Sequence, residues 1–108
     1  MKKIAIPTDN NVSISQDFAN AKWFKIIEVE NNHVGSFRYI ENNLSQSNGQ
    51  KDLDLVRKLS DCEVIIAREI SSKTQEEFQS MNKKIIITNE IQMDVAVDAF
   101  IKGITATN

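Results

Sequence analysis

The sequence contains one cysteine, Cys62, and one histidine, His33, among its 108 residues. One thiol cannot close an internal disulfide, and alone it cannot supply the thiolates of a structural zinc site or of a self-contained iron–sulfur site. Neither residue belongs to a CxxC, an HExxH or another cysteine–histidine pair at metal-ligand spacing. We therefore exclude a disulfide-stapled fold, predict a reducing, cytoplasmic location, and find only a weak metal signal in the sequence itself.

Each of these two residues has an ordinary interpretation. Cys62 precedes an apolar run and is interpreted as a buried, inert thiol, the usual state of a free cysteine. The alternative is a homodimer in which two copies of Cys62 meet around a cluster or form a mixed disulfide. His33 follows the turn-like pair Asn31-Asn32, so we expect a surface imidazole.

Long apolar runs and an excess of positive charge are also missing. After Lys2-Lys3, three apolar residues precede Pro7, which is too few for the hydrophobic region of a signal peptide. No apolar run approaches the roughly 20 residues of a membrane-spanning helix. Thirteen Lys and Arg against 15 Asp and Glu give 13 − 15 = −2, which disfavours binding to nucleic acid. The polar loop from Asn42 to Gly49 has no glycine pattern that cradles nucleotide phosphates.

The sequence does carry the composition of a folded domain, with 41% hydrophobic and 26% charged residues. We expect a single domain over residues 1–108. Alternating or apolar runs predict strands over 2–8, 23–30 and 33–41, the last two joined as a hairpin. In 23–30 the pattern fits a sheet with one face well buried.

The second half of the chain alternates helical and strand patterns. Residues 50 to 60 carry Leu53, Val56 and Leu59 at helical spacing, with Leu55 alongside. Short apolar runs at 64–67 and 85–87 predict strands buried on both faces. Ser72 with Gln75, and Asn89 with Gln92, predict capping boxes that start two further helices. The first carries Phe78 and Met81, and the second turns Val97, Phe100, Ile101 and Ile104 inward, with Gly103 near its end.

This order predicts an α/β fold with a mixed five-stranded sheet and three helices. The first half of the chain contains a hairpin, and the second half follows a βαβ pattern. Together they predict the strand order 3-2-1-4-5 with strand 2 antiparallel, which is the ribonuclease H-like arrangement. Ligands of such sheets gather beyond the carboxyl ends of the parallel strands. Those ends carry Thr8-Asp9, Arg68-Glu69 and Asn89-Glu90.

We expect this rim to be the working surface. Asp9, Asp17 and Glu69 could share a hard cation, while Arg68 could bind an anion. The alternative is that these are solvated loop and helix-start charges.

Several segments, taken in order, resemble a known family. They are Lys3 to Asp9 (KIAIPTD), Ile14 to Phe24 (ISQDFANAKWF), Ile27 to Asn31 (IEVEN), Ile40 to Asn42, Val64 to Ala67 and the helix ending Phe100 to Gly103. The second segment is similar to V-S-x-H-F-G-x-A-x-x-F of the dinitrogenase iron-molybdenum cofactor biosynthesis domains, and the similarity covers most of the chain. The resemblance implies a ribonuclease H-like motif fold.

For function, the resemblance implies a small, non-enzymatic carrier or accessory module for iron-molybdenum cofactor or an iron–sulfur precursor. Its partners would be a cofactor-assembly protein or a small anionic or metallic ligand, with no nucleic acid or membrane, and the chain would be a monomer or homodimer. The implied cofactor-binding residues are Asp9, Ser15, Asp17, Asn20, Asn48, Gly49, Arg68 and Glu69.

Four of these residues, at three places in the sequence, depart from the family pattern. Asp17 stands where the family has histidine, which exchanges an imidazole for a carboxylate that suits soft iron less well. Arg68-Glu69 replaces Gly-Gly, and Asn48-Gly49 replaces His-Gly. We therefore keep open a degenerate interaction module in which Arg68 pairs with Glu69 or Asp17 and closes the pocket. A metal-dependent nuclease is disfavoured, because the interior of the first strand (Ile4 to Ile6) holds no carboxylate.

Overall fold

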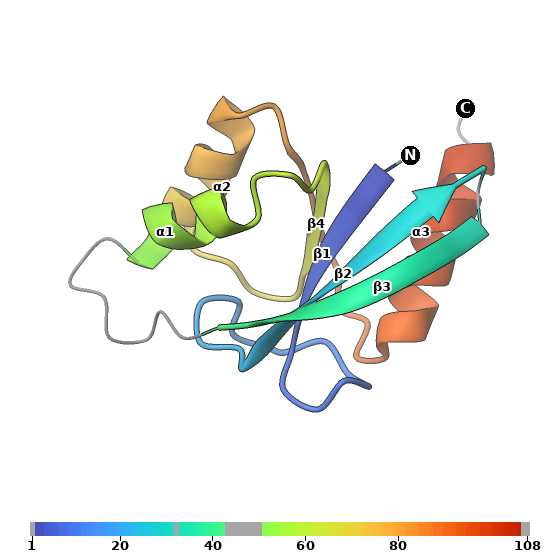
Figure 1. Ribbon diagram of the computed structural model, residues 1–108, viewed down its shortest axis with the longest axis horizontal. Coiled ribbons are helices and arrows are strands. Elements are labelled where there is room, and N and C mark those ends of the chain that lie inside the picture. The colour runs from blue at the N-terminus through green and yellow to red at the C-terminus, as the bar shows by residue number, and fades with distance from the viewer. Residues whose placement is uncertain (1, 32, 43–50, 107–108) are drawn as a thin grey trace.

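The computed structural model describes residues 2–31, 33–42 and 51–106. These residues form, in order, β1 (Lys2–Thr8), β2 (Trp23–Glu30), β3 (His33–Glu41), α1 (Lys51–Lys58), β4 (Val64–Ala67), α2 (Ser72–Ser80), β5 (Lys84–Ile87) and α3 (Met93–Ala106). The strands lie in one sheet of order β3-β2-β1-β4-β5 (Figure 1). β2 is antiparallel to β1 and β3, and β4 is parallel to β1 and β5. The predicted fold class is confirmed.

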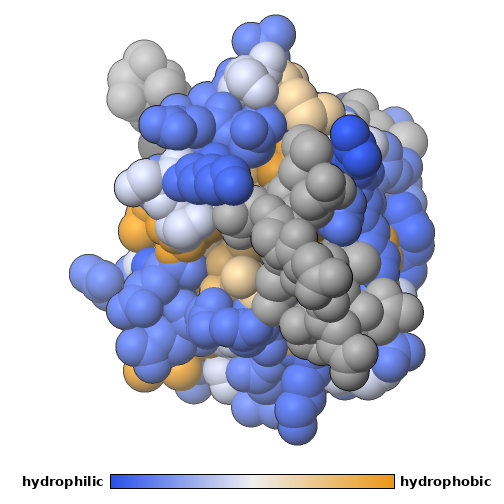
Figure 2. Space-filling model, turned by 90° about the vertical axis from the view of Figure 1, so that its left-hand side faces the viewer, coloured by the Kyte–Doolittle hydropathy of each residue, from blue (hydrophilic) through white to orange (hydrophobic). Residues whose placement is uncertain are grey.

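Helices cover both faces of the central strands. α3 lies on one face, and α1 and α2 lie on the other (Figure 1). Consecutive residues of a strand point to opposite faces, so Ile66 of β4 joins the core under α3 while Ile65 joins the core under α1 and α2. On the side that carries α1, most of the described surface is hydrophilic, with small apolar areas between (Figure 2).

Burial differs from the sequence prediction in two strands. β2 buries side chains on both faces, with Phe24 and Ile26 under α1 and α2 and Ile27 and Val29 under α3, so the prediction of one buried face was wrong. β5 is only half-buried, and Ile87 is 52% exposed, because this strand ends the sheet. The prediction of a strand buried on both faces holds for β4, whose four residues are all buried.

Two helix starts also differ from the predicted capping boxes. The N-cap of α2 is Ser71, whose hydroxyl accepts a hydrogen bond from the backbone N–H of Thr74, and Ser72 is already helical. Met81 follows the helix and is exposed. α3 begins at Met93 rather than beside Asn89, and its first helical bond runs from Ala96 N–H to the Gln92 carbonyl.

The hairpin forms as predicted, with Asn31 at φ 53° in its turn and His33 exposed at the start of β3. β3 carries one extra residue opposite Glu28, since Val34 pairs with Val29 but Phe37 pairs with Ile27. This β-bulge shifts the register of β3, which lies at one edge of the sheet.

Three predictions fall wholly or partly outside what the structure describes. Asn48 and Gly49 lie outside the described residues. The predictions for the side chains of Leu53 and Ile104 also lie outside what the structure describes. Among the helices described, none has the length and apolar character needed to cross a membrane.

Candidate functional site

The segment that follows β1 is tied down along the carboxyl end of the sheet. Thr8 is fully buried, and its hydroxyl donates to the Ser13 carbonyl (2.7 Å) and accepts from the Asn11 N–H (3.0 Å). The Ser15 N–H donates to the Pro7 carbonyl, and the Ile14 N–H donates to the Ile91 carbonyl, both at 2.8 Å. These bonds fix the segment between β1 and the residues that precede α3.

The next part of this segment runs beside the chain that leaves β4. Asp17 and Glu69 form an isolated parallel bridge, and the Phe18 N–H donates to the Glu69 carbonyl (3.2 Å). The Phe18 ring is buried against Phe24 and Phe78, with centroid distances of 5.1 and 6.0 Å. Phe18 therefore anchors the segment in the core.

The Asp17 carboxylate organises the turn that follows it. It accepts from the Asn20 backbone N–H (3.3 Å) and from the Asn20 side-chain Nδ2 (2.7 Å). The buried Ser15 hydroxyl donates to the Asp17 carbonyl (3.2 Å). Ser15, Asp17 and Asn20, three of the predicted site residues, are thus brought together.

The described residues form two hollows at this end of the sheet. The larger hollow, of about 440 Å³, is lined by Asp17 to Ala19 and by Glu69, Ile70, Ser71 and Thr74. The smaller hollow, of about 200 Å³, is lined by Asp9, Asn10, Ser13 to Gln16, Arg68 and Ile91.

Arg68 and Glu69 lie in different hollows because successive residues at the end of a strand point to opposite faces. The Gln16 side chain bridges the two, since its Nε2 donates to Glu69 Oε1 at 3.3 Å. The rim is therefore two sites rather than one.

The hypothesis of one cation shared by Asp9, Asp17 and Glu69 was wrong. Asp9 lies in the smaller hollow, where its carboxylate accepts the Lys22 N–H at 2.9 Å, while Asp17 and Glu69 line the larger hollow. Within the described ranges, no three His, Cys, Asp or Glu side chains come close enough to hold a metal ion.

The ion pair that would close the pocket does not form either. In the part of the chain that the structure describes, the salt bridges join Lys3 to Asp61, Arg38 to Asp61 and Lys102 to Asp98. Arg68 pairs with neither Glu69 nor Asp17 there, so both hollows stay open.

Cys62 and His33 lie at the other end of the sheet. Cys62 precedes β4 and His33 pairs with Glu30, both beside the amino end of β1. Burial raises the pKa of the Cys62 thiol to about 12, with a further contribution from the Asp61 charge. The interpretation of Cys62 as a buried thiol and of His33 as a surface imidazole is confirmed.

Asp61 anchors a small charge cluster at this amino end. Burial by itself would raise the pKa of its carboxyl, but the Lys3 hydrogen bond and charge, together with the Arg38 charge, hold that pKa below its usual value. The cluster is remote from both hollows and takes no part in them.

Sequence reasoning missed part of the lining of the hollows. Ser71 and Thr74 face the larger hollow from the start of α2, and Ile91 faces the smaller one from the segment before α3. The Ser71-Ser72 pair could have indicated the first two, since hydroxyl residues before a helix favour its N-terminus. No sequence signal marks Ile91.

Solved structures share this architecture over nearly the whole chain. A candidate dinitrogenase from Methanocaldococcus jannaschii is 26% identical, with a TM-score of 0.73 over 94% of this chain and 88% of that one. A candidate NifB protein from Thermotoga is also 26% identical, with a TM-score of 0.73 over 95% and 90%. The apo form of the orange protein from Desulfovibrio gigas shares the fold, with a TM-score of 0.79 at 20% identity over 95% and 89%.

The family of the chain is shown by a match to a family profile. No curated protein matches the chain in sequence. The profile of a protein family, described as dinitrogenase iron-molybdenum cofactor, matches residues 1–103. This match confirms the resemblance that the motifs indicated, and the chain belongs to the dinitrogenase iron-molybdenum cofactor family.

Proposed function

We propose that this chain is a small, non-enzymatic carrier module that holds a metal–sulfur cargo in the larger hollow. The observation that carries the proposal is the hollow of about 440 Å³ between Asp17 to Ala19 and the start of α2. Its size is in the range of small-ligand sites, and it lies at the sheet edge where α/β folds bind ligands. Family membership and the candidate NifB relative support this class of cargo.

The described side chains of the hollow suggest how the cargo would be held. They offer carboxylates from Asp17 and Glu69 and hydroxyls from Ser71 and Thr74, with no thiol or imidazole among them. The N-terminal end of α2 supplies backbone N–H groups and a partial positive charge, which would offset part of the repulsion between an anionic cargo and the two carboxylates. Asp17 is the candidate metal ligand, because it stands at the position of the family histidine.

This holding arrangement would be weak, which suits a carrier. A carboxylate is a hard ligand and binds soft cluster iron less firmly than a thiolate or imidazole does. Cargo bound in this way would leave readily to a cofactor-assembly partner protein. We keep the cytoplasm as the compartment in which this exchange would take place.

The test is anaerobic reconstitution of the full chain with iron and sulfide, followed by gel filtration and metal analysis. We expect brown, iron-containing protein, and more retained iron in the Asp17→His variant, because imidazole is the better iron ligand. Asp9→His is the matched control. It places the same imidazole in the smaller hollow, so it should retain no more iron than the parent chain.

The other outcomes reject the proposal in distinguishable ways. Colourless protein from the parent chain and from Asp17→His would exclude a cluster in this hollow. Colour in Asp17→His alone would mean that the hollow accepts a cluster that the natural chain does not carry. The chain would then be the interaction module without a metal ligand. Equal retention by Asp17→His and Asp9→His would mean that iron is held elsewhere.

A further inference from the structure

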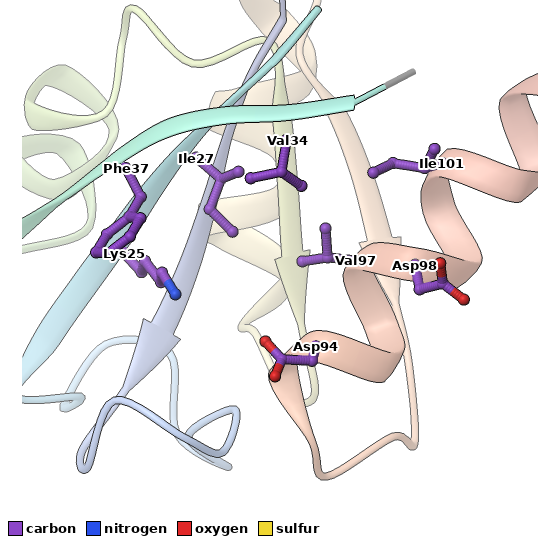
Figure 3. A pocket seen from close by; sticks show the side chains of 8 residues that line it. All are labelled: Lys25, Ile27, Val34, Phe37, Asp94, Val97, Asp98 and Ile101. Carbon is purple, nitrogen blue, oxygen red and sulfur yellow. The ribbon is translucent and has the colours of Figure 1, made fainter.

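A separate groove lies between the outermost strand and α3 (Figure 3). We call it the β3–α3 groove, and its apolar walls are Ile27, Val34 and Phe37 from the sheet and Val97 and Ile101 from α3. Its volume is about 260 Å³. None of these residues lines either hollow at the carboxyl end of the sheet, so the groove is a distinct site.

The groove exposes two apolar side chains of β3 that lie outside the core, whereas Ile27 and Val97 in its walls are core residues. α3 packs over β1, β2 and β4 but leaves β3 uncovered, so Val34 is 49% exposed and Phe37 is 56% exposed. Apolar groups are normally withdrawn from water, and contiguous exposed ones mark interaction sites.

The aromatic wall of the groove is held in place. The Phe37 ring meets the Tyr39 ring edge-on, with a centroid distance of 5.7 Å and an interplanar angle of 76°. The Lys25 ammonium lies 4.5 Å from the Phe37 centroid, in cation–π contact, and 5.7 Å from the Tyr39 centroid. A side chain fixed in this way loses little conformational freedom when a partner binds, which favours affinity.

The charge at the groove is negative on the helix side. Asp98 pairs with Lys102 at 2.9 Å, and Figure 3 shows its carboxylate directed away from the strands. The Asp94 carboxylate is directed toward the strands (Figure 3). Among the described residues, Asp94 has no hydrogen bond or ion pair through its side chain. The Lys25 ammonium keeps its positive charge but lies over the Phe37 ring on the sheet side of the groove, so the Asp94 carboxylate is left without an ion-pair partner on the helix side, beside the apolar floor.

We propose that the β3–α3 groove binds a segment of a partner protein in which an apolar side chain is flanked by a lysine or arginine. The apolar side chain would lie between Phe37, Val97 and Ile101, and the basic one would pair with Asp94. This chemistry matches the charge and the exposed apolar area together. The inference is independent of the proposed cargo.

The test is selection of random short peptides displayed on phage against the full chain, followed by affinity and NMR measurements on the enriched peptides. We expect enriched sequences with an apolar residue next to Lys or Arg, and chemical-shift changes at Val34, Phe37, Val97 and Ile101. Phe37→Ser should weaken binding about tenfold or more, as for an interface anchor. Asp94→Lys should turn the selection toward acidic flanking residues.

Asp98→Lys is the matched control. It changes a neighbouring carboxylate that points away from the strands, and it should leave the basic preference intact. No enrichment, enrichment unaffected by Phe37→Ser, or a flanking-charge preference unchanged in Asp94→Lys would each overturn the proposal. Self-association in sedimentation that Phe37→Ser abolishes would also overturn it, because the occupant would then be a second copy of the chain.

Discussion

Cys62 shows how one buried group can be chemically silent. Its thiol is fully buried, and burial raises its pKa to about 12. Because the thiolate is the reactive form, we predict slow modification of the native protein by a disulfide reagent at pH 8 and fast modification in urea. Absorbance of the released thiolate measures both rates. Fast labelling of the native chain would contradict the burial.

The same group gives a pH dependence with a defined sign. The folded-state pKa lies above the ordinary value of 9.0, so the protonated thiol stabilises the fold fully below pH 9. That stabilisation is lost as the pH rises toward 12. In Cys62→Ala, the fall in the free energy of unfolding over this alkaline range should be smaller than in the parent chain. Equal falls in both proteins would assign the loss to other groups.

Thr8 is the residue on which the position of the smaller hollow depends. Its buried hydroxyl holds both the Ser13 carbonyl and the Asn11 N–H. We predict that Thr8→Val lowers the free energy of unfolding by about 1–3 kcal/mol, because buried polar groups lose their partners. Urea denaturation measures this loss. In the control Thr88→Val, a half-buried hydroxyl loses one hydrogen bond, from Glu90, and the loss should be smaller.

Among the helices and strands, α2 has two adjacent serines at its start, and only one of them is the N-cap. The Ser71 hydroxyl accepts the Thr74 N–H, whereas Ser72 is the exposed first helical residue. We predict that Ser71→Ala costs about 1 kcal/mol of stability, the usual value for a lost N-cap. Ser72→Ala should cost almost nothing. Thermal unfolding of both variants decides between the two, and the reverse order would restore the capping box that the sequence suggested.

The helices and strands could be predicted from the sequence where the spacing of apolar residues is typical of one or the other. The alternation in 2–8 and 23–30 and the apolar run at 64–67 predicted the strands correctly. That alternation did not predict the burial of β1 and β2 on both faces of the sheet. The start of α2 could not be predicted to the residue, since Ser71 and Ser72 are chemically identical caps. The exposure of Ile87 could not be predicted either, because an apolar edge strand has the same sequence pattern as a central strand.

The sequence predicts at which end of the sheet the candidate site lies, but not which residues share a hollow. Strand order puts Asp9, Asp17 and Arg68 at one end of the sheet, as expected. The sequence does not show on which side of the sheet Asp9 and Asp17 fall. That depends on the turn in which Asn10 Oδ1 accepts the Val12 and Ser13 N–H groups, and on the packing of Phe18 in the core. The separation of Arg68 from Glu69, by contrast, follows from strand alternation and could have been predicted from the sequence.

For the whole molecule, β4 joins two cores through adjacent residues. Ile65 packs under α1 and α2 and Ile66 packs under α3. We predict that Ile65→Ala and Ile66→Ala each cost roughly 2–5 kcal/mol, as for other core truncations. Each should also shift one common unfolding transition. In urea, Trp23 fluorescence follows the loss of tertiary structure and far-UV circular dichroism follows the loss of secondary structure.

The control for this pair is Ile87→Ala. Ile87 is 52% exposed at the end of β5, so its loss should be within about 0.5 kcal/mol, as for surface changes. Separate transitions for fluorescence and circular dichroism in either core variant would show that the two cores unfold independently.

The β-bulge in β3 has a consequence for the behaviour of the protein at high concentration. An outermost strand with free backbone groups is a template on which further chains can add and form fibrils. The extra residue opposite Glu28 breaks the even spacing of those groups midway along the strand. Unbroken cross-β stacking on this edge is therefore disfavoured.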